Sequence, residues 1–158
     1  TVIIPPCHGG VRGSIPRRTA IFNMNIIILS LLILSYSLVL GIIFAQVLLT
    51  APVVFKVLDD ESASKFLRKI FPRYYLLILL ISLISSLISF LWFESFDLYM
   101  ALSISILAFI GYAIIPITNF ARDRGWDNLF KWMHNLSVAN TIIILLISLT
   151  QLVRIINS

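Results

Sequence analysis

Four long blocks of uncharged, apolar residues constrain this chain more than any other feature. They cover residues 26–49, 74–93, 100–119 and 135–153, and none contains Asp, Glu, Lys or Arg. A helix over residues 26–49 would be about 36 Å long at 1.5 Å per residue, more than the roughly 30 Å hydrocarbon core of a bilayer. Because lipid offers no partner to a free amide, each block must form an α-helix that satisfies its own backbone. The sequence therefore predicts an all-α integral membrane protein, a four-helix bundle.

Composition supports this prediction and narrows the partners. Hydrophobic residues make up 59% of the chain and charged residues 12%, against roughly 45–50% and about 25% in soluble domains. The formal charge of +5 comes from basic residues spread over separate loops, with no aromatic-basic motif beside them. We therefore expect the lipid bilayer as the surrounding and no nucleic acid as a partner. The single cysteine, Cys7, has no CxxC or CxxCH context and indicates no chemistry.

The charges between the spans predict their orientation, because Lys and Arg are retained on the cytoplasmic side. The second loop carries Glu94 and Asp97 and no basic residue. Loops one and three carry the basic residues Lys56, Lys65, Arg68, Lys69, Arg73, Arg122, Arg124 and Lys131. We expect a multi-pass protein of the cell membrane, the inner membrane of a bacterium. Loops one and three would then be cytoplasmic and both termini outside.

Residues 1–23 differ in composition from the membrane domain of residues 24–158. Their prolines, glycines and arginines are typical of a disordered tail. Residues 12–17 can be encoded by the conserved T-arm of a transfer-RNA gene, including its complementary stem. We hypothesise that these upstream residues are a mis-annotated translation and that the protein starts at Met24. The alternatives are a genuine basic tail and, less favoured, a twin-arginine export signal. A basic tail would pull the N-terminus inward, against the loop charges, which favours the start at Met24.

The first loop carries a helical pattern of its own. Asp59 or Asp60 can cap a short helix, whose apolar residues repeat at helical spacing opposite basic ones. The apolar face consists of Ala63, Phe66, Leu67, Ile70 and Phe71. This pattern predicts a short amphipathic interfacial helix on the cytoplasmic membrane surface, ended by Pro72. An aromatic belt at the interfaces is expected from Tyr74, Tyr75, Trp92, Tyr99, Trp126 and Trp132.

Small and hydroxyl side chains predict which helix faces pack, since membrane helices associate where their backbones can approach closely. Each span carries such a stripe: Ser37, Gly41 and Ala45; Ser82, Ser85, Ser86 and Ser89; Ala101, Ser105, Ala108 and Gly111; Ser137, Thr141 and Ser148. We interpret these stripes as the seams of a compact bundle. A polar conduction path is the less favoured alternative, because the stripes hold no charged residue at mid-depth.

Polar side chains, tyrosines and prolines cluster near one membrane face, the cytoplasmic one in the predicted topology. The cluster comprises Gln46, Thr50, Pro52, Pro72, Arg73, Tyr74, Tyr75, Pro116, Thr118, Asn119, Arg122, His134, Asn135 and Asn140. Pro52 and Pro116 each break the helical ladder near the end of a span and leave backbone acceptors free. The simplest interpretation is that the amides and His134 satisfy backbone groups and one another, while Arg122 anchors to lipid phosphate. A binding site is the alternative.

Catalysis finds little support in the residue types. Residues 24–158 contain one histidine, His134, and no cysteine, so ligand count excludes a protein-only zinc site or a bis-histidine haem within one chain. Asp59, Asp60 and Glu61 resemble a helix N-terminus more than a paired acid and base. We expect no enzymatic activity, no metal site and no cofactor.

Four motifs, in order along the chain, resemble a known family. They are APVVF at residues 51–55, KIFPRYY at 69–75, PITNFAR at 116–122 and FKWMHNLSVAN at 130–140. Together they look like the transmembrane protein 205-like family, with the bacterial domain of unknown function 4149, over residues 24–155. The resemblance implies a small four-span membrane protein without an established activity. It also implies that the motif positions matter, namely Pro52, Phe71, Pro72, Asn119, Arg122, His134 and Asn140. The animal members are longer between the third and fourth spans, so a role of that loop is not expected here.

The leading hypothesis is a non-enzymatic bundle that binds a partner or a small ligand at its cytoplasmic face. The candidate binding residues are Pro52, Phe71, Pro72, Arg73, Pro116, Asn119, Arg122, His134 and Asn140. A transporter or efflux-accessory role is the second hypothesis, and a haem- or quinone-linked redox role a distant third. Besides lipid, the expected partners are another membrane protein or a further copy of this chain.

Overall fold

The computed structural model describes residues 17–92 and 95–157, with side chains from Ile26 onward. Its elements are α1 (Arg17–Phe44), the π-helix η1 (Ala45–Thr50), α2 (Ala51–Val57), α3 (Asp60–Trp92), α4 (Ser95–Asp123) and α5 (Asp127–Asn157). Four stretches are long and apolar enough to cross a membrane: Ile26–Val57, Asp60–Trp92, Ser95–Asp123 and Asp127–Asn157. Each predicted span falls on one of them, and the predicted all-α four-helix architecture is confirmed.

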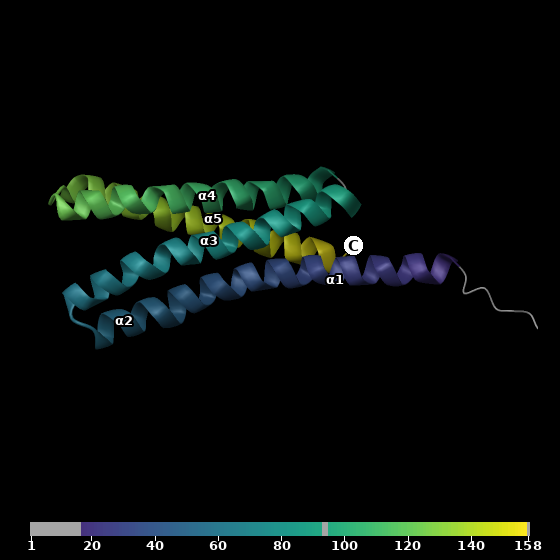
Figure 1. The fold of residues 1–158 in the computed structure, drawn as a ribbon, viewed down its shortest axis with the longest axis horizontal. Helices are drawn as coiled ribbons and strands as arrows, with labels where there is room; N and C mark the ends of the chain where they lie inside the picture. The colour runs from purple at the N-terminus through teal and green to yellow at the C-terminus, as the bar shows by residue number, and fades with distance from the viewer. Residues whose placement is uncertain (1–16, 93–94, 158) are drawn as a thin grey trace, which may run out of the picture.

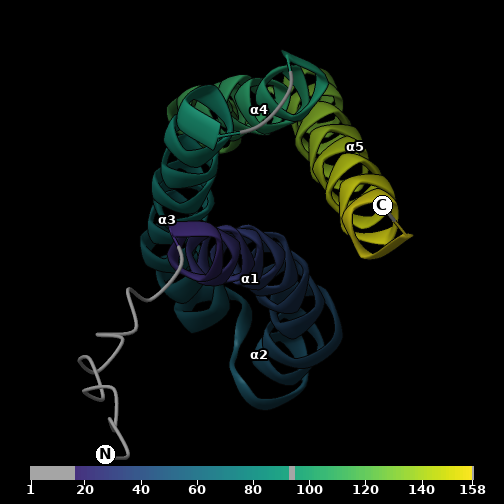
Figure 2. The same ribbon diagram turned by 90° about the vertical axis from the view of Figure 1, so that its right-hand side faces the viewer.

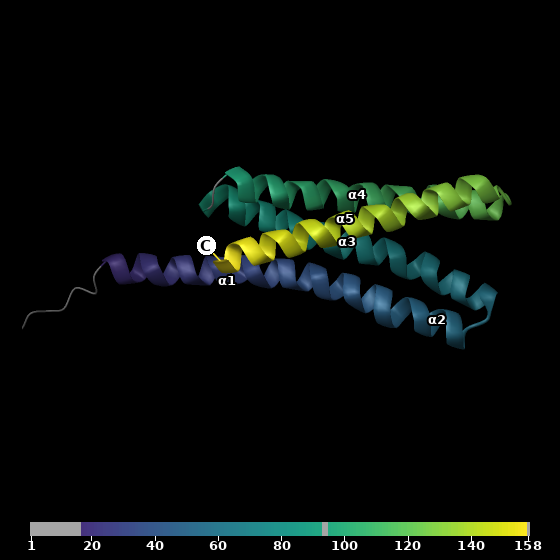
Figure 3. The same ribbon diagram turned by 180° about the vertical axis from the view of Figure 1, so that it is seen from behind.

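The helices run alternately up and down one long axis (Figure 1). The α2–α3 and α4–α5 turns lie at the same end of the bundle, as Figure 3 shows from behind. We call this the basic end, because loops one and three with their Lys and Arg residues are there. Viewed along the axis, α3, α4 and α5 form an arc and α1 lies between α3 and α5 (Figure 2). Neighbours around this ring pack together, whereas the described residues of the diagonal pairs, α1 with α4 and α3 with α5, nowhere bring Cα atoms within 8 Å.

Helix α1 begins before the expected start of the membrane domain. Its backbone is helical from Arg17, within the stretch for which composition predicted a disordered tail. No proline occurs between Pro16 and Pro52, and a helix that has nucleated in the apolar span can therefore extend backward at little cost. Residues 1–16 lie outside the described part of the chain, and translation from Met24 stays a prediction.

The amphipathic segment of the first loop is helical but is not a separate interfacial helix. Helix α3 runs unbroken from Asp60 to Trp92, with Pro72 inside it, so the predicted end at Pro72 is wrong. A proline in a helix interior costs about 3 kcal/mol, and tertiary contacts offset that cost here. Ala63 is buried, and Arg68 donates to Asp123 at the end of α4 with an Nη1–Oδ2 distance of 2.9 Å. These contacts hold the segment in line with its span.

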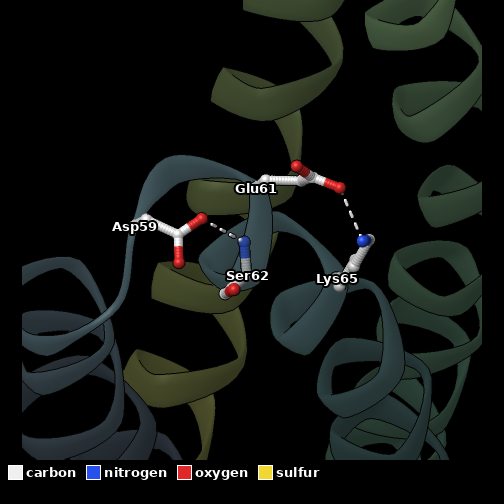
Figure 4. Close-up of polar contacts among 4 residues, drawn as sticks. All are labelled: Asp59, Glu61, Ser62 and Lys65. Atoms are coloured by element: carbon white, nitrogen blue, oxygen red, sulfur yellow. Dashed lines mark hydrogen bonds and ion pairs between the residues drawn. The ribbon is translucent and has the colours of Figure 1, made fainter.

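Helix α3 starts at the predicted cap. The Asp59 carboxylate accepts a hydrogen bond from the backbone N–H of Ser62 at 3.1 Å (Figure 4), the N-cap geometry that satisfies a free amide of the first turn. Glu61 and Lys65 form an exposed ion pair one turn further on. Hydrogen bonds from Ser62 hold the pKa of the Asp59 carboxyl below its usual range. The stability that this cap contributes is therefore fully present above the ordinary aspartate pKa and is lost as the pH falls through the lowered pKa of Asp59.

The predicted seams are confirmed in α3 and α4 and wrong in α1. Ser82, Ser85, Ser86 and Ser89 are buried against Ala101, Ser105, Ala108 and Gly111, and the Ser105 hydroxyl donates to Ser82 at 2.9 Å. In α1, the small residues Ser37, Gly41 and Ala45 are exposed. The buried face of α1 includes the large side chains Leu32, Tyr36, Val39 and Ile43. Close approach rewards small residues only where a partner helix follows the same face, and α1 fills the open side of the ring with large side chains instead.

Tyr74 and Tyr75 do not belong to the interfacial belt, as predicted, but to the core. Tyr75 is 1% exposed and Tyr74 7%, whereas Trp92, Tyr99, Trp126 and Trp132 are at least half exposed, as predicted for a belt. Tyr75 lies against Gly111, where a Cβ would overlap its ring. Because that space is free, the ring passes across α4 and its hydroxyl reaches Thr141 of α5 at 2.8 Å. One side chain thus joins two helices whose backbones do not meet.

A polar clamp closes the opposite end of the bundle. Asp97, which the sequence placed among the loop charges, is 5% exposed in the first turn of α4. Its Oδ1 accepts hydrogen bonds from Gln151 and from Arg154 of α5, the latter at 2.9 Å. The Arg154 guanidinium also lies over the Phe96 ring, 4.4 Å from its centroid. The carboxylate is thereby compensated although it is buried, and it ties α4 to α5.

Candidate functional site

A cavity of about 440 Å³ lies inside the basic end of the bundle. Its walls come from η1, α2, α3, α4 and α5, and they are mostly apolar with a few polar groups among them. The volume is within the range of pockets that hold small molecules in proteins. At this end α2 and α5 lie apart, as Figures 1 and 3 show, and residues of both helices line the cavity.

The π-helix η1 shapes one wall of this cavity. Pro52 lacks an N–H and its ring crowds the carbonyl four residues earlier, which disfavours a regular α-helical turn before it. The chain responds with a wider turn, in which the Ala51 N–H donates to the Gln46 carbonyl five residues back. The Thr50 hydroxyl caps the same turn on the Ala45 carbonyl at 3.2 Å. Such π-turns are frequent at functional sites, and this one places Gln46 in the cavity wall.

Two polar atoms in the wall have no partner. The Nε2 of Gln46 and the hydroxyl of Tyr74 are buried, and neither makes a hydrogen bond of ordinary geometry with a described residue, although the Thr141 side chain lies near the Tyr74 hydroxyl. Their side chains are 8% and 7% exposed, and both line the cavity. A buried polar group without a partner costs about 1–3 kcal/mol, so each calls for a partner that the chain does not supply, such as a water molecule or a ligand. Both atoms can donate a hydrogen bond, which indicates an acceptor oxygen on that molecule.

The facing wall is polar and already satisfied. The Tyr75 hydroxyl contacts the Ser137 hydroxyl at 3.0 Å and the Thr141 hydroxyl at 2.8 Å. Thr141 in turn donates to the Ser137 carbonyl at 3.0 Å. This network orients the ring of Tyr75, and the two unpartnered donors belong to other side chains of the cavity wall, Gln46 and Tyr74.

The cavity ends in a charged rim. Arg122 lies over the Phe130 ring, 5.7 Å from its centroid, and His134 stacks on the same ring with centroids 6.0 Å apart. Both side chains are exposed and both line the cavity. Arg68 is engaged by Asp123, whereas Arg122 has no carboxylate within 4.0 Å among the described residues. The rim therefore carries a net positive charge, because Arg68 and Arg122 both lie near the carboxylate of Asp123.

The structure brings four of the nine predicted site residues together. Phe71, Asn119, Arg122 and His134, from three different helices, line the cavity. The sequence had also placed Gln46, Tyr74, Tyr75 and Thr118 near this face, without assigning them to the site, and these line the cavity too. Gln46 could have been found as the one amide side chain within its apolar span, six residues before a proline.

The other five predicted residues do not line the cavity. Pro52 acts on it through η1, and Pro72 is half-buried in α3. Arg73 and Pro116 are exposed, and α4 continues through Pro116 to Asp123. Asn140 is 4% exposed and donates to the Leu107 carbonyl at 3.0 Å. Its amide thus satisfies a backbone group, which was the simpler of the two interpretations.

The part of the chain from 17 to 92 and from 95 to 157 contains no group of three His, Cys, Asp or Glu side chains that could hold a metal ion. The cavity lining itself, as far as the described residues go, includes neither a carboxylate nor a thiol. Its chemistry is that of hydrogen-bond donors, aromatic rings and the two guanidinium groups of Arg68 and Arg122.

Comparison with known families identifies the domain. A family model described as a domain of unknown function, DUF4149, matches residues 34–127, more than half of the chain. The chain belongs to the DUF4149 family. The match runs from the middle of α1 to the first residue of α5 and includes Phe71, Asn119 and Arg122. No curated protein and no solved structure matches the DUF4149 chain. The wider resemblance to the transmembrane protein 205-like family stays a prediction.

Proposed function

We propose that this DUF4149 protein is a non-enzymatic membrane protein that binds a small amphiphilic ligand in the cavity at its basic end, on the cytoplasmic side. The observation that carries this proposal is the pair of unpartnered donors, Gln46 Nε2 and the Tyr74 hydroxyl, in the wall of a 440 Å³ cavity. An empty site of this kind costs stability, and a ligand with an acceptor oxygen removes that cost.

Binding fits the wall better than catalysis does. An acid, a base or a nucleophile needs a partner that activates it. His134, the histidine of the rim, stacks on Phe130 and is exposed. The hydroxyls of Tyr75, Ser137 and Thr141 bond one another and the backbone. Among the residues that the structure describes, none of these side chains has the activating partner that catalysis needs, but their rings and hydroxyls form a fixed wall for a bound molecule. This supports a binding role.

The test is substitution of Gln46 by Leu, which keeps the approximate volume and removes the unpartnered donor. We expect less of a copurifying small molecule by mass spectrometry of the protein in mild detergent. We also expect the stripped variant to be about 1–2 kcal/mol more stable than the stripped wild type, because a buried polar atom without a partner is gone.

Ser89→Ala is the matched control. The Ser89 hydroxyl is also buried without a partner, yet it lies outside the cavity lining. It should affect stability in the same direction and leave ligand retention unchanged. Equal retention by Gln46→Leu and wild type, across all copurifying molecules, would contradict the proposed site.

A further inference from the structure

The cavity has an open side between two segments that do not meet. Helix α1 packs against α5, but beyond Phe44 no described Cα atom of η1 or α2 comes within 8 Å of one in α5. Cavity residues on both edges of this gap are exposed: Val47 and Phe55 on one side, Val138 and Ile142 on the other, by 45–65%. All four are apolar and belong to membrane-spanning stretches. The open side therefore faces hydrocarbon.

The rim of the same cavity has the opposite character. Arg122 has no carboxylate partner in the described residues, and His134 and Asn119 add further donors beside it. The surrounding basic end carries Lys65, Lys69, Arg73, Arg124 and Lys131 as well. A guanidinium in such a place favours an anion with oxygen acceptors, phosphate above all.

The open side and the rim of the cavity together fit one kind of molecule. It has an anionic group at the rim, acceptor oxygens for Gln46 and Tyr74 further in, and apolar chains that leave through the open side. A soluble phosphate would leave the apolar walls empty, and a neutral lipid would leave Arg122 without a partner. Phospholipids with an acidic headgroup have all three features in one molecule.

On the basis of the proposed function, we propose that the ligand is an acidic phospholipid that enters sideways from the bilayer between η1–α2 and α5. The headgroup lies against Arg122 and His134. The ester oxygens provide acceptors toward the interior, and the acyl chains pass between Val47 and Ile142 into the surrounding lipid.

The headgroup is tested by native mass spectrometry of the full chain, delipidated in a non-ionic detergent and supplied with equal amounts of phosphatidylglycerol and phosphatidylcholine. We expect one phosphatidylglycerol to be retained about tenfold better than phosphatidylcholine, because Arg122 attracts the phosphate of both lipids but repels the choline cation of the second. Arg122→Gln should abolish the preference. Arg124→Gln is the matched control, since Arg124 is an exposed arginine of the same end that lies over Phe120 instead of lining the cavity.

The entry route is tested by a bulky residue at the opening. Ile142→Trp should lower phosphatidylglycerol retention several-fold, because Ile142 lines the cavity edge. Ile143→Trp should not, because the equally exposed Ile143 lies outside that lining. Glycerol phosphate, the headgroup without chains, should not compete at millimolar concentration.

Each contrary outcome has a distinct meaning. Equal retention of the two lipids by the wild type, or loss of preference in Arg124→Gln as in Arg122→Gln, overturns the acidic-lipid assignment and leaves a binding cavity standing. Competition by glycerol phosphate overturns the lipid in favour of a soluble anion. If instead Gln46→Leu and Ile142→Trp both retain every ligand as the wild type does, the cavity is not the site and the proposed function fails with the inference.

Discussion

At the residue scale, the absence of one side chain decides the shape of the interior. Gly111 leaves the space through which the Tyr75 ring crosses α4, and the hydroxyl then bonds Thr141 of α5. The spacing of small residues in this span predicted a packed seam. It could not predict that one of them faces a tyrosine, because Tyr75 lies on a different helix and its rotamer depends on the fold.

We predict that Gly111→Ala destabilises the protein by about 1–3 kcal/mol, since the added methyl overlaps the ring and overpacking has this typical cost. The small gain in helix propensity, about 1 kcal/mol, opposes this loss. Equilibrium unfolding in mixed micelles, monitored by tryptophan fluorescence, measures the difference. Gly41→Ala is the control, because nothing lies within 4 Å of a Cβ at Gly41, and it should not be destabilising. Equal loss in both variants would refute the packing described for Tyr75.

The buried carboxylate at the opposite end allows a second prediction at this scale. Asp97→Asn keeps the shape and an acceptor for Gln151 but leaves the Arg154 guanidinium without its charge partner. We expect a loss of about 1–3 kcal/mol in unfolding free energy, because removal of one partner of a buried pair exposes the cost of the other. Glu61→Gln breaks an exposed pair and should have no measurable effect. If Asp97→Asn left the unfolding free energy unchanged, the clamp would not hold α4 to α5.

At the scale of elements, the three prolines of the spans have two different effects on helix geometry. Before Pro52 the helix widens into η1, whereas at Pro72 and Pro116 it continues. The sequence predicted a break at each, because a proline always removes one backbone donor. The surroundings of these prolines differ, since α3 and α4 pack against each other, whereas no described Cα atom of α2 comes within 8 Å of one in α5.

The role of Pro52 can be tested directly. Pro52→Ala restores an N–H that can bond the carbonyl four residues back, so residues 45–50 should return to an α-helix. When the five-residue spacing of the backbone hydrogen bonds in the wide turn changes to four, the two halves of the span rotate by about 100° relative to each other. Gln46 and the α2 residues can then no longer face the cavity together. We expect ligand retention to fall by about fivefold, measured by native mass spectrometry, with the fold unchanged by circular dichroism.

Pro116→Ala provides the comparison, because Pro116 is an exposed proline in a transmembrane helix outside the cavity lining. It should retain the ligand as the wild type does. If Pro52→Ala retained as much ligand as Pro116→Ala does, the π-helix would not be needed for binding.

At the scale of the whole molecule, the bundle has one end with the cavity and the unpaired cation and another end closed by Asp97, Gln151 and Arg154. Four spans place both termini on one side of a membrane, and the distribution of Lys and Arg predicts that loops one and three are cytoplasmic. The cavity would then open toward the inner leaflet.

This orientation is checked by cysteine labelling in intact cells, after replacement of Cys7 by Ser. Ser62→Cys, in the first turn of α3, should react with a membrane-impermeant maleimide only after the cells are permeabilised. Ser95→Cys, at the exposed start of α4, should react without permeabilisation. The reverse labelling would place the cavity outside and invert the topology.

The sequence by itself determined the medium, the number of spans and the concentration of Lys and Arg in loops one and three, because these depend only on the local balance between apolar side chains and charges. It also identified the cap at Asp59, whose partner is three residues away. Which faces of the helices meet was decided only by the tertiary structure. Tyr74 and Tyr75 are buried in the core, and the small residues Ser37, Gly41 and Ala45 are exposed. Gln46 lies in the cavity wall, where its Nε2 has no hydrogen-bond partner among the residues described. These outcomes depend on how four helices share one interior, a relation between residues far apart in the chain that no local pattern contains.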